Sequence, residues 1–198
     1  MLQLFNEKGR VFPVTAIQAG PLKVTELKTK NRDGYSAVQI GYGDQKLSRL
    51  SKGQQKSRQK NETRGWRHLR EFRLPEADLE QFALGQELTV GQFAEGDTVL
   101  IRGFSKGKGF QGVVKRHGFH GGPRSHGQKH SEREPGSIGG GLRTRVPKGM
   151  RMAGRMGGDK VTVKNLKIIK IDLDAHQVFV GGAVPGRPGT ILEIRATN

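Results

Sequence analysis

A glycine-rich motif is the first place in this sequence where residue types and spacing suggest chemistry. Residues 107–112 read Gly-Lys-Gly-Phe-Gln-Gly and match G-x-G-x-x-G, the pattern of dinucleotide-binding loops. Such a loop works between a strand and a helix of a βαβ unit. A strand is predicted before the motif, but residues 113–123 are too rich in glycine to form a long helix. We therefore interpret these glycines as positions where backbone N–H groups approach phosphates, and keep a nucleotide-dependent enzyme as the alternative.

Four histidines, His117, His120, His126 and His130, lie within 14 residues of one another. Imidazole suits zinc, and the spacing permits a metal site. However, the chain has no cysteine, few carboxylates lie nearby, and the flanking residues are cationic and repel a metal ion. Stacking on bases or donating to phosphate fits this setting better, so no metal or cofactor is expected.

Ser137, His126 and Glu134 supply the residue types of a hydrolytic triad. They lie in a segment rich in glycine and proline that offers no rigid scaffold to hold a catalytic geometry. We therefore expect no enzyme activity and no small-molecule substrate.

Methionines interleave with arginines and glycines in residues 148–157, which read Lys-Gly-Met-Arg-Met-Ala-Gly-Arg-Met-Gly. In a globular protein methionine usually marks the core. Here the alternation favours a strip packed against RNA, because thioethers fill irregular gaps and guanidinium groups bind phosphates.

All of these motifs belong to one basic segment, residues 104–160. It holds 13 Lys and Arg, three acidic residues and 15 glycines, so it carries +10 of the chain's net charge of +17. Large apolar residues are too sparse to offset its ordering entropy, so a dense polyanion must order it. Nucleic acid is the first candidate. An acidic membrane surface is disfavoured because the segment cannot form an amphipathic helix. A free DNA-binding protein remains a further alternative.

Strands are predicted on both sides of the basic segment. Apolar alternation and turn signals place them at residues 11–17, 22–29, 35–42, 66–74 and 98–103, and again at 161–163, 166–171, 177–180 and 190–195. Short turns join the first three, which predicts an antiparallel meander. Strands that flank a single irregular insertion indicate that the two halves pair into one small barrel.

The sequence therefore predicts a mainly β fold, a small antiparallel β-barrel body with a long basic glycine-rich loop and a smaller polar insertion. The body comprises residues 1–103 and 161–198, and the loop residues 104–160. The polar basic insertion, residues 44–65, is either a solvated loop or a second RNA contact. An out-and-back loop of this length reaches on the order of 50–90 Å at ~3.3 Å per residue.

Several motifs, in the same order along the chain, resemble the bacterial-type family of ribosomal protein three of the large subunit. They are the pattern from Phe93 to Gly112, Ser125 to Gly127, Arg133 to Gly139, Lys148 to Gly157 and Gly182 to Gly186. Residues 17–43 look closest to cyanobacterial and plastid members. The family implies a β-barrel body and a loop that threads through large-subunit rRNA towards the peptidyl-transferase centre. It also implies early subunit assembly, neighbouring ribosomal proteins as partners, no membrane, and a ribosome in bacterial cytoplasm or plastid stroma.

The resemblance also implies which residues bind rRNA. The loop tip corresponds to Pro135, Gly136, Ser137 and Ile138. The basic or aromatic stretches correspond to Lys106, Lys108, Phe110, Lys115, Arg116, Arg133, Lys148, Arg151 and Arg155, and we add His117, Arg124, His126, Arg143 and Arg145 from the same segment.

The sequence departs from the family pattern at two places. The family usually opens with Gly-Lys-Lys-x-Gly-Met, and Met1 aligns with its last residue, so the resemblance implies that a first barrel strand is either missing or supplied differently. Residues 140–145 are one residue short and lack the glutamine that many bacterial members have methylated, so no modification is carried over.

Overall fold

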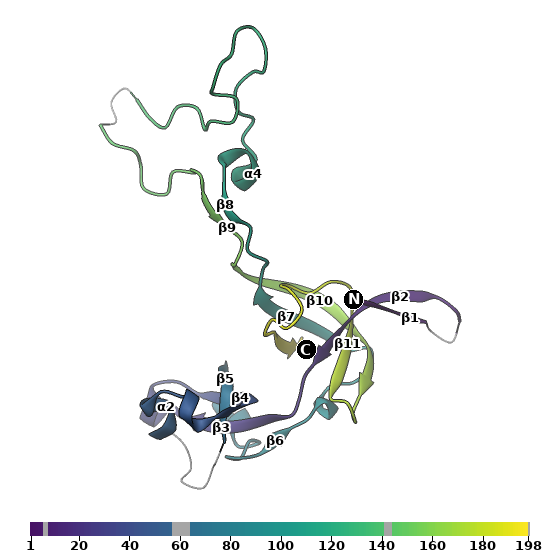
Figure 1. Cartoon of the computed structure of the whole chain (residues 1–198). Helices are drawn as coiled ribbons and strands as arrows, with labels where there is room; N and C mark the ends of the chain where they lie inside the picture. Colours follow the sequence, from purple (N-terminus) through teal and green to yellow (C-terminus); the bar gives the residue numbers. More distant parts are fainter. Residues whose placement is uncertain (6–7, 57–63, 141–143, 198) are drawn as a thin grey trace. The chain divides into compact units, whose positions relative to one another are not determined.

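The computed structural model describes residues 1–5, 8–56, 64–140 and 144–197. Their strands form a six-stranded sheet, a four-stranded sheet and a two-stranded ribbon, and seven of the strand pairs are antiparallel (Figure 1). The chain divides into two compact units. Unit 1 comprises Met1–Val99, Asn165–Ala183 and Ala196–Asn198, and unit 2 comprises Leu100–Lys164 and Val184–Arg195. The mainly β fold class is confirmed.

The six-stranded sheet has the order β1-β2-β11-β10-β7-β12. These strands are β1 (Leu2–Phe5), β2 (Val11–Gln18), β7 (Thr98–Phe104), β10 (Lys160–Asp172), β11 (Gln177–Gly181) and β12 (Glu193–Ala196). The alternation read from the sequence explains its core. In β11, Val178 and Val180 are fully buried while their neighbours stay partly exposed. Each such buried side chain stabilises the fold by roughly 1.5–3 kcal/mol.

The four-stranded sheet has the order β5-β4-β3-β6 and lies in unit 1. Its strands are β3 (Leu22–Lys28), β4 (Ala37–Lys46), β5 (Arg64–Arg73) and β6 (Glu87–Leu88). The turn helix α1 (Lys30–Asp33) joins β3 to β4 and ends at Gly34, whose φ of 80° suits glycine. A small core of Val24, Val38 and Leu79 holds the sheet against the helical turn α3 (Glu76–Leu79).

A charged cluster covers part of this sheet. The Tyr35 hydroxyl donates a hydrogen bond of 2.9 Å to the Glu71 carboxylate, and the Lys28 ammonium lies 3.3 Å from the same carboxylate. The Tyr35 hydrogen bond is the main reason that the pKa of Glu71 falls below its usual value. The Arg73 guanidinium lies 5.0 Å from the centre of the Tyr35 ring, so one tyrosine organises charges of both signs.

The polar insertion is shorter than predicted. Strand β4 continues to Lys46, and the short helices η1 (Leu47–Arg49) and α2 (Lys52–Lys56) follow it. Strand β5 begins at Arg64, and residues 57–63 lie outside the described residues. A further 3-10 turn, η2 (Val90–Gln92), precedes β7.

The pairing of the first strands corrects the predicted meander. β2 lies in the six-stranded sheet and β3 in the four-stranded sheet, so the meander consists of β3, β4 and β5 instead. β2 belongs to the six-stranded sheet because it pairs with β11. Just after β2, the Ala19 N–H donates a hydrogen bond of 2.9 Å to the His176 carbonyl. The Gly20-Pro21 turn therefore leads from one sheet to the other.

The expected barrel changes as well. At one end of the six-stranded sheet, Leu4 of β1 lies opposite Phe12 of β2. A closed barrel is not found among the described residues, because β1 and β12 are the unjoined ends of the six-stranded order. The strands on either side of the basic segment do join one sheet, through β7 and β10.

Candidate nucleic-acid interface

The two arms of the basic segment run side by side in unit 2. The Ser105 N–H donates 2.9 Å to the Asp159 carbonyl, and the Lys108 N–H donates 2.9 Å to the Met156 carbonyl. Beyond these bonds, β8 (Gly109–Gln111) and β9 (Gly154–Met156) form an antiparallel ribbon in which Phe110 lies opposite Arg155 (Figure 1). Gly157, at φ 76°, is required here, because a Cβ atom would overlap the Lys106 carbonyl.

A short helix, α4 (Val113–His117), follows β8 and is fastened to the returning arm. The Arg116 guanidinium donates 2.6 Å to the Met152 carbonyl, and His117 Nε2 lies 3.1 Å from the same oxygen. Gly118, at φ 72°, ends the helix. Arg116 and His117 are only partly exposed. They therefore position the two arms rather than projecting into solvent.

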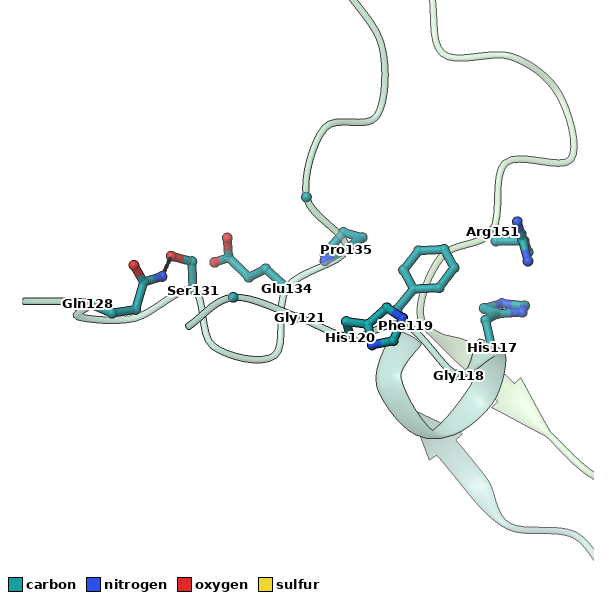
Figure 2. Close-up of a pocket in the computed structure, with 12 residues that line it drawn as sticks. His117, Gly118, Phe119, His120, Gly121, Gln128, Ser131, Glu134, Pro135 and Arg151 are labelled. Carbon is teal, nitrogen blue, oxygen red and sulfur yellow. Dashed lines mark hydrogen bonds between the residues drawn. The ribbon is translucent and has the colours of Figure 1, made fainter. Parts of the chain in front are cut away.

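A hollow of about 540 Å³ lies next to this helix, and we call it the Phe119 hollow (Figure 2). The Arg151 guanidinium lies 5.4 Å from the centre of the Phe119 ring, and the His117 and Phe119 ring centres are 5.9 Å apart with an interplanar angle of 43°. The hollow is lined by His117, Gly118, Phe119, His120, Gly121, Gly122, Gln128, Ser131, Glu134, Pro135, Gly136 and Arg151.

Most of the residues predicted to bind rRNA are exposed. They are Lys106, Lys108, Phe110, Lys115, Arg124, His126, Arg133, Pro135, Gly136, Ser137, Ile138, Arg145, Lys148, Arg151 and Arg155. Arg143 lies outside the described residues. Arg124 forms an ion pair of 2.6 Å with Glu132. Within the described part of the chain, the other Lys and Arg of this set have no ion-pair partner, so their charges are available to an anion.

The predicted rRNA-binding set does not include Phe119, His120 and Glu134, which line the hollow; His120 and Glu134 were considered only for other chemistry. Phe119 itself was a signal in the sequence that could have indicated the hollow, because an aromatic residue in a glycine-rich basic segment has little apolar core to join. The proximity of Phe119 to Arg151 follows only from the fold, since 31 intervening residues separate them in the sequence.

The structure gives the alternative chemistries no geometric support. The G-x-G-x-x-G motif lies in a two-stranded ribbon and leads to a helix of five residues, which is not the βαβ setting of a dinucleotide site. The Ser137 hydroxyl donates to the Gly139 carbonyl at 3.3 Å. Among the residues that the structure describes, no three His, Asp or Glu side chains are grouped to hold a metal ion. In the same residues, no helix is long and apolar enough to span a membrane.

Comparison with known proteins identifies the family. Residues 76–184, more than half of the chain, match the family model of ribosomal protein L3. The chain belongs to the ribosomal protein L3 family. It is 49% identical to large ribosomal subunit protein uL3 of Herpetosiphon aurantiacus over 200 residues, covering 100% of this chain and 93% of the relative.

Two cyanobacterial relatives of the L3 family are also similar over nearly their whole length. The uL3 protein of Prochlorococcus marinus is 47% identical over 199 residues, covering 100% of this chain and 90% of the relative. That of Thermosynechococcus vestitus is 44% identical over 195 residues, covering 98% and 91%. The resemblance inferred from the motifs is therefore confirmed, and the L3 family is one of structural ribosomal proteins rather than enzymes.

Proposed function

We propose that this chain is a structural constituent of the large ribosomal subunit and binds large-subunit rRNA directly. One observation carries the proposal: the arms of residues 104–160 present exposed Lys and Arg side chains that lack ion-pair partners within the described residues. An anionic partner must supply the missing counter-charges, and family membership makes that partner rRNA. No cofactor or small-molecule substrate is required.

The mechanism is neutralisation of phosphates where RNA helices crowd together. The β8–β9 ribbon and α4 hold the two arms together, so their cations reach the RNA as one ordered group. Glycines let the backbone approach phosphates closely. Affinity then rests on the shape and backbone of the folded RNA rather than on a base-by-base code. Binding becomes steeply salt-dependent, with a log–log slope of roughly −0.7 to −0.9 per phosphate neutralised.

We assign direct rRNA contact to the exposed residues of the predicted set and to Arg143. Arg116 and His117 act mainly by positioning, since both bond to the Met152 carbonyl. Arg124 contributes less charge than its neighbours because Glu132 already balances it.

The same proposal extends to the place of the protein in the subunit. Segment 104–160 is the extended loop of the family and stabilises rRNA near the peptidyl-transferase centre, with any influence on peptide-bond formation acting through the positioning of rRNA. The chain joins early in subunit assembly and contacts neighbouring ribosomal proteins. Its location is the ribosome, in a bacterial cytoplasm or a plastid stroma.

The test compares binding of the full-length chain to large-subunit rRNA and to duplex DNA of similar length. We expect saturable binding with a clear preference for the structured RNA. Trypsin should cut residues 104–160 first in the free protein and lose access in the RNA complex. A preference for duplex DNA, or protection of this segment without RNA, would contradict the proposal.

A further inference from the structure

The Phe119 hollow has a chemistry that phosphate neutralisation does not explain. Its volume of about 540 Å³ lies within the range of roughly 300–1,000 Å³ found for pockets that bury small molecules. Its lining combines planar or apolar side chains, among them Phe119, His120 and Pro135, with polar side chains and backbone glycines. A phosphate-binding site would instead gather lysines and arginines, and Arg151 is the single one of these in the lining.

One end of the hollow offers a stacking surface. In the view of Figure 2, Phe119 lies between Arg151 and His117 on one side and Pro135 and His120 on the other. The Phe119 ring is partly exposed. Aromatic rings and guanidinium planes of this kind are the groups on which splayed-out RNA bases stack.

The other end of the hollow carries the Glu134 carboxylate, whose negative charge does not suit a phosphate site. Glu134 has no cationic partner within the described residues, whereas nearby Glu132 is paired with Arg124 at 2.6 Å. An ionised carboxylate only accepts hydrogen bonds, so it needs a donor and repels phosphate. Glu134 and Phe119 line the same hollow, and Figure 2 shows Pro135 between them in this view. The ribose 2′-hydroxyl is a hydrogen-bond donor carried beside the base, and DNA lacks it.

The walls of the hollow are formed by two chain segments fixed to each other. The Gly122 N–H donates 2.9 Å to the Glu132 carbonyl. Gly121, at φ 76°, lies so close to the same carbonyl that a Cβ atom would overlap it. The Gln128 side chain donates to the Ser131 hydroxyl across the same turn. The hollow is therefore walled by segments that are hydrogen-bonded to each other.

We propose that the Phe119 hollow binds one unpaired nucleotide of the rRNA, with its base against Phe119 and its ribose 2′-hydroxyl donating to Glu134. The inference rests on the proposed rRNA binding and adds a nucleoside site to a surface that otherwise reads shape and charge. The nucleotide's phosphates remain outside, among the exposed cations of the two arms.

The experiment uses the full-length chain bound to large-subunit rRNA. Ultraviolet crosslinking, read at nucleotide and peptide resolution, should join residues 117–122 to a single unpaired nucleotide. Phe119→Leu should lose this crosslink and bind roughly 5- to 150-fold more weakly with an unchanged salt slope, because stacking releases no counterions. Phe12→Leu, which alters an exposed ring of β2 outside the basic segment, should keep both the crosslink and the affinity. Fluorescence of Trp66 checks that unit 1 of each variant remains folded.

The ribose contact has its own test. Replacing the crosslinked nucleotide by its 2′-deoxy form should weaken binding of the unaltered chain roughly tenfold or more, the usual loss for a hydrogen bond to a charged group. The same replacement should leave Glu134→Ala unaffected. Three results would overturn the site: no crosslink at residues 117–122, full affinity in Phe119→Leu, or equal 2′-deoxy sensitivity with and without Glu134. Failure of the unaltered chain to bind rRNA would overturn the proposed function as well. That result is distinguishable from failure of the nucleotide site alone.

Discussion

Replacing Lys106, Lys108 and Arg155 by glutamine removes three exposed cations in or beside the β8–β9 ribbon. Glutamine retains the backbone N–H groups, so the 2.9 Å bond from the Lys108 N–H to the Met156 carbonyl persists. If each cation neutralises one phosphate, the magnitude of the log–log salt slope falls by about 2 to 3. Between about 50 and 200 mM salt, the affinity of the unaltered chain then drops roughly 20- to 40-fold further than that of the triple variant.

The assay is equilibrium binding of the full-length chain to large-subunit rRNA over a salt series. Arg32→Gln is the control, because the Arg32 guanidinium is exposed but already paired with Glu26 at 2.9 Å and with Asp33 at 3.0 Å. We expect this control to leave the slope unchanged. A triple variant with the slope of the unaltered chain, or a control that lowers it equally, would refute the assignment of free cations to phosphates.

Three other substitutions test the structural argument. Gly41→Ala should destabilise the four-stranded sheet by roughly 1–3 kcal/mol, because its Cβ would lie 2.5 Å from the Trp66 ring; denaturant unfolding followed by tryptophan fluorescence measures this. Glu71→Gln should remove the stabilisation that the ionised Glu71 carboxylate gives the folded state by accepting a hydrogen bond from the Tyr35 hydroxyl. This stabilisation is complete above the ordinary carboxyl pKa and is lost as pH falls through the lowered pKa of the folded state. Unfolding across an acid pH series measures it. Arg116→Gln should speed amide hydrogen exchange in α4 at least roughly tenfold and leave the salt slope unchanged, because the side chain anchors the helix.

For each of these three substitutions, a different result would contradict the structural argument. An unchanged unfolding midpoint for Gly41→Ala would show that the Trp66 ring moves aside at little cost. A stability difference for Glu71→Gln that stays constant from neutral to acid pH would contradict the role given to its ionised carboxylate. A salt slope that falls by about 0.7–0.9 in Arg116→Gln would assign that guanidinium to a phosphate instead.

The strands of this fold were predictable because their signals are local. Alternating apolar residues and turn residues define β10, β11 and the hairpin between them, and the structure has them near the expected positions. Partner choice was not predictable in the same way. Nothing between residues 11 and 29 indicates that β2 pairs with β11, a strand more than 150 residues later, while β3 pairs with β4. The predicted barrel failed for this reason, since closure depends on long-range pairing.

The candidate interface was likewise predictable from the sequence only in part. Composition alone predicted an anion-binding role for residues 104–160, because charge and glycine content do not depend on tertiary structure. The different contacts of individual arginines within this segment could be told only from the structure. Arg116 and Arg151 look alike in the sequence, yet one anchors a helix to a carbonyl and the other lies over an aromatic ring. Their partners, Met152 and Phe119, lie on the opposite arm in each case.

Mapping RNA crosslinks from individual lysines in assembled large subunits would show whether the basic segment binds rRNA. We expect crosslinks to rRNA from Lys106, Lys108 and Lys148, three of the exposed lysines of this segment. We expect fewer from Lys28, whose ammonium is held by Glu71 at 3.3 Å. Crosslinks confined to unit 1, with none from Lys106, Lys108 or Lys148, would contradict rRNA binding by the basic segment.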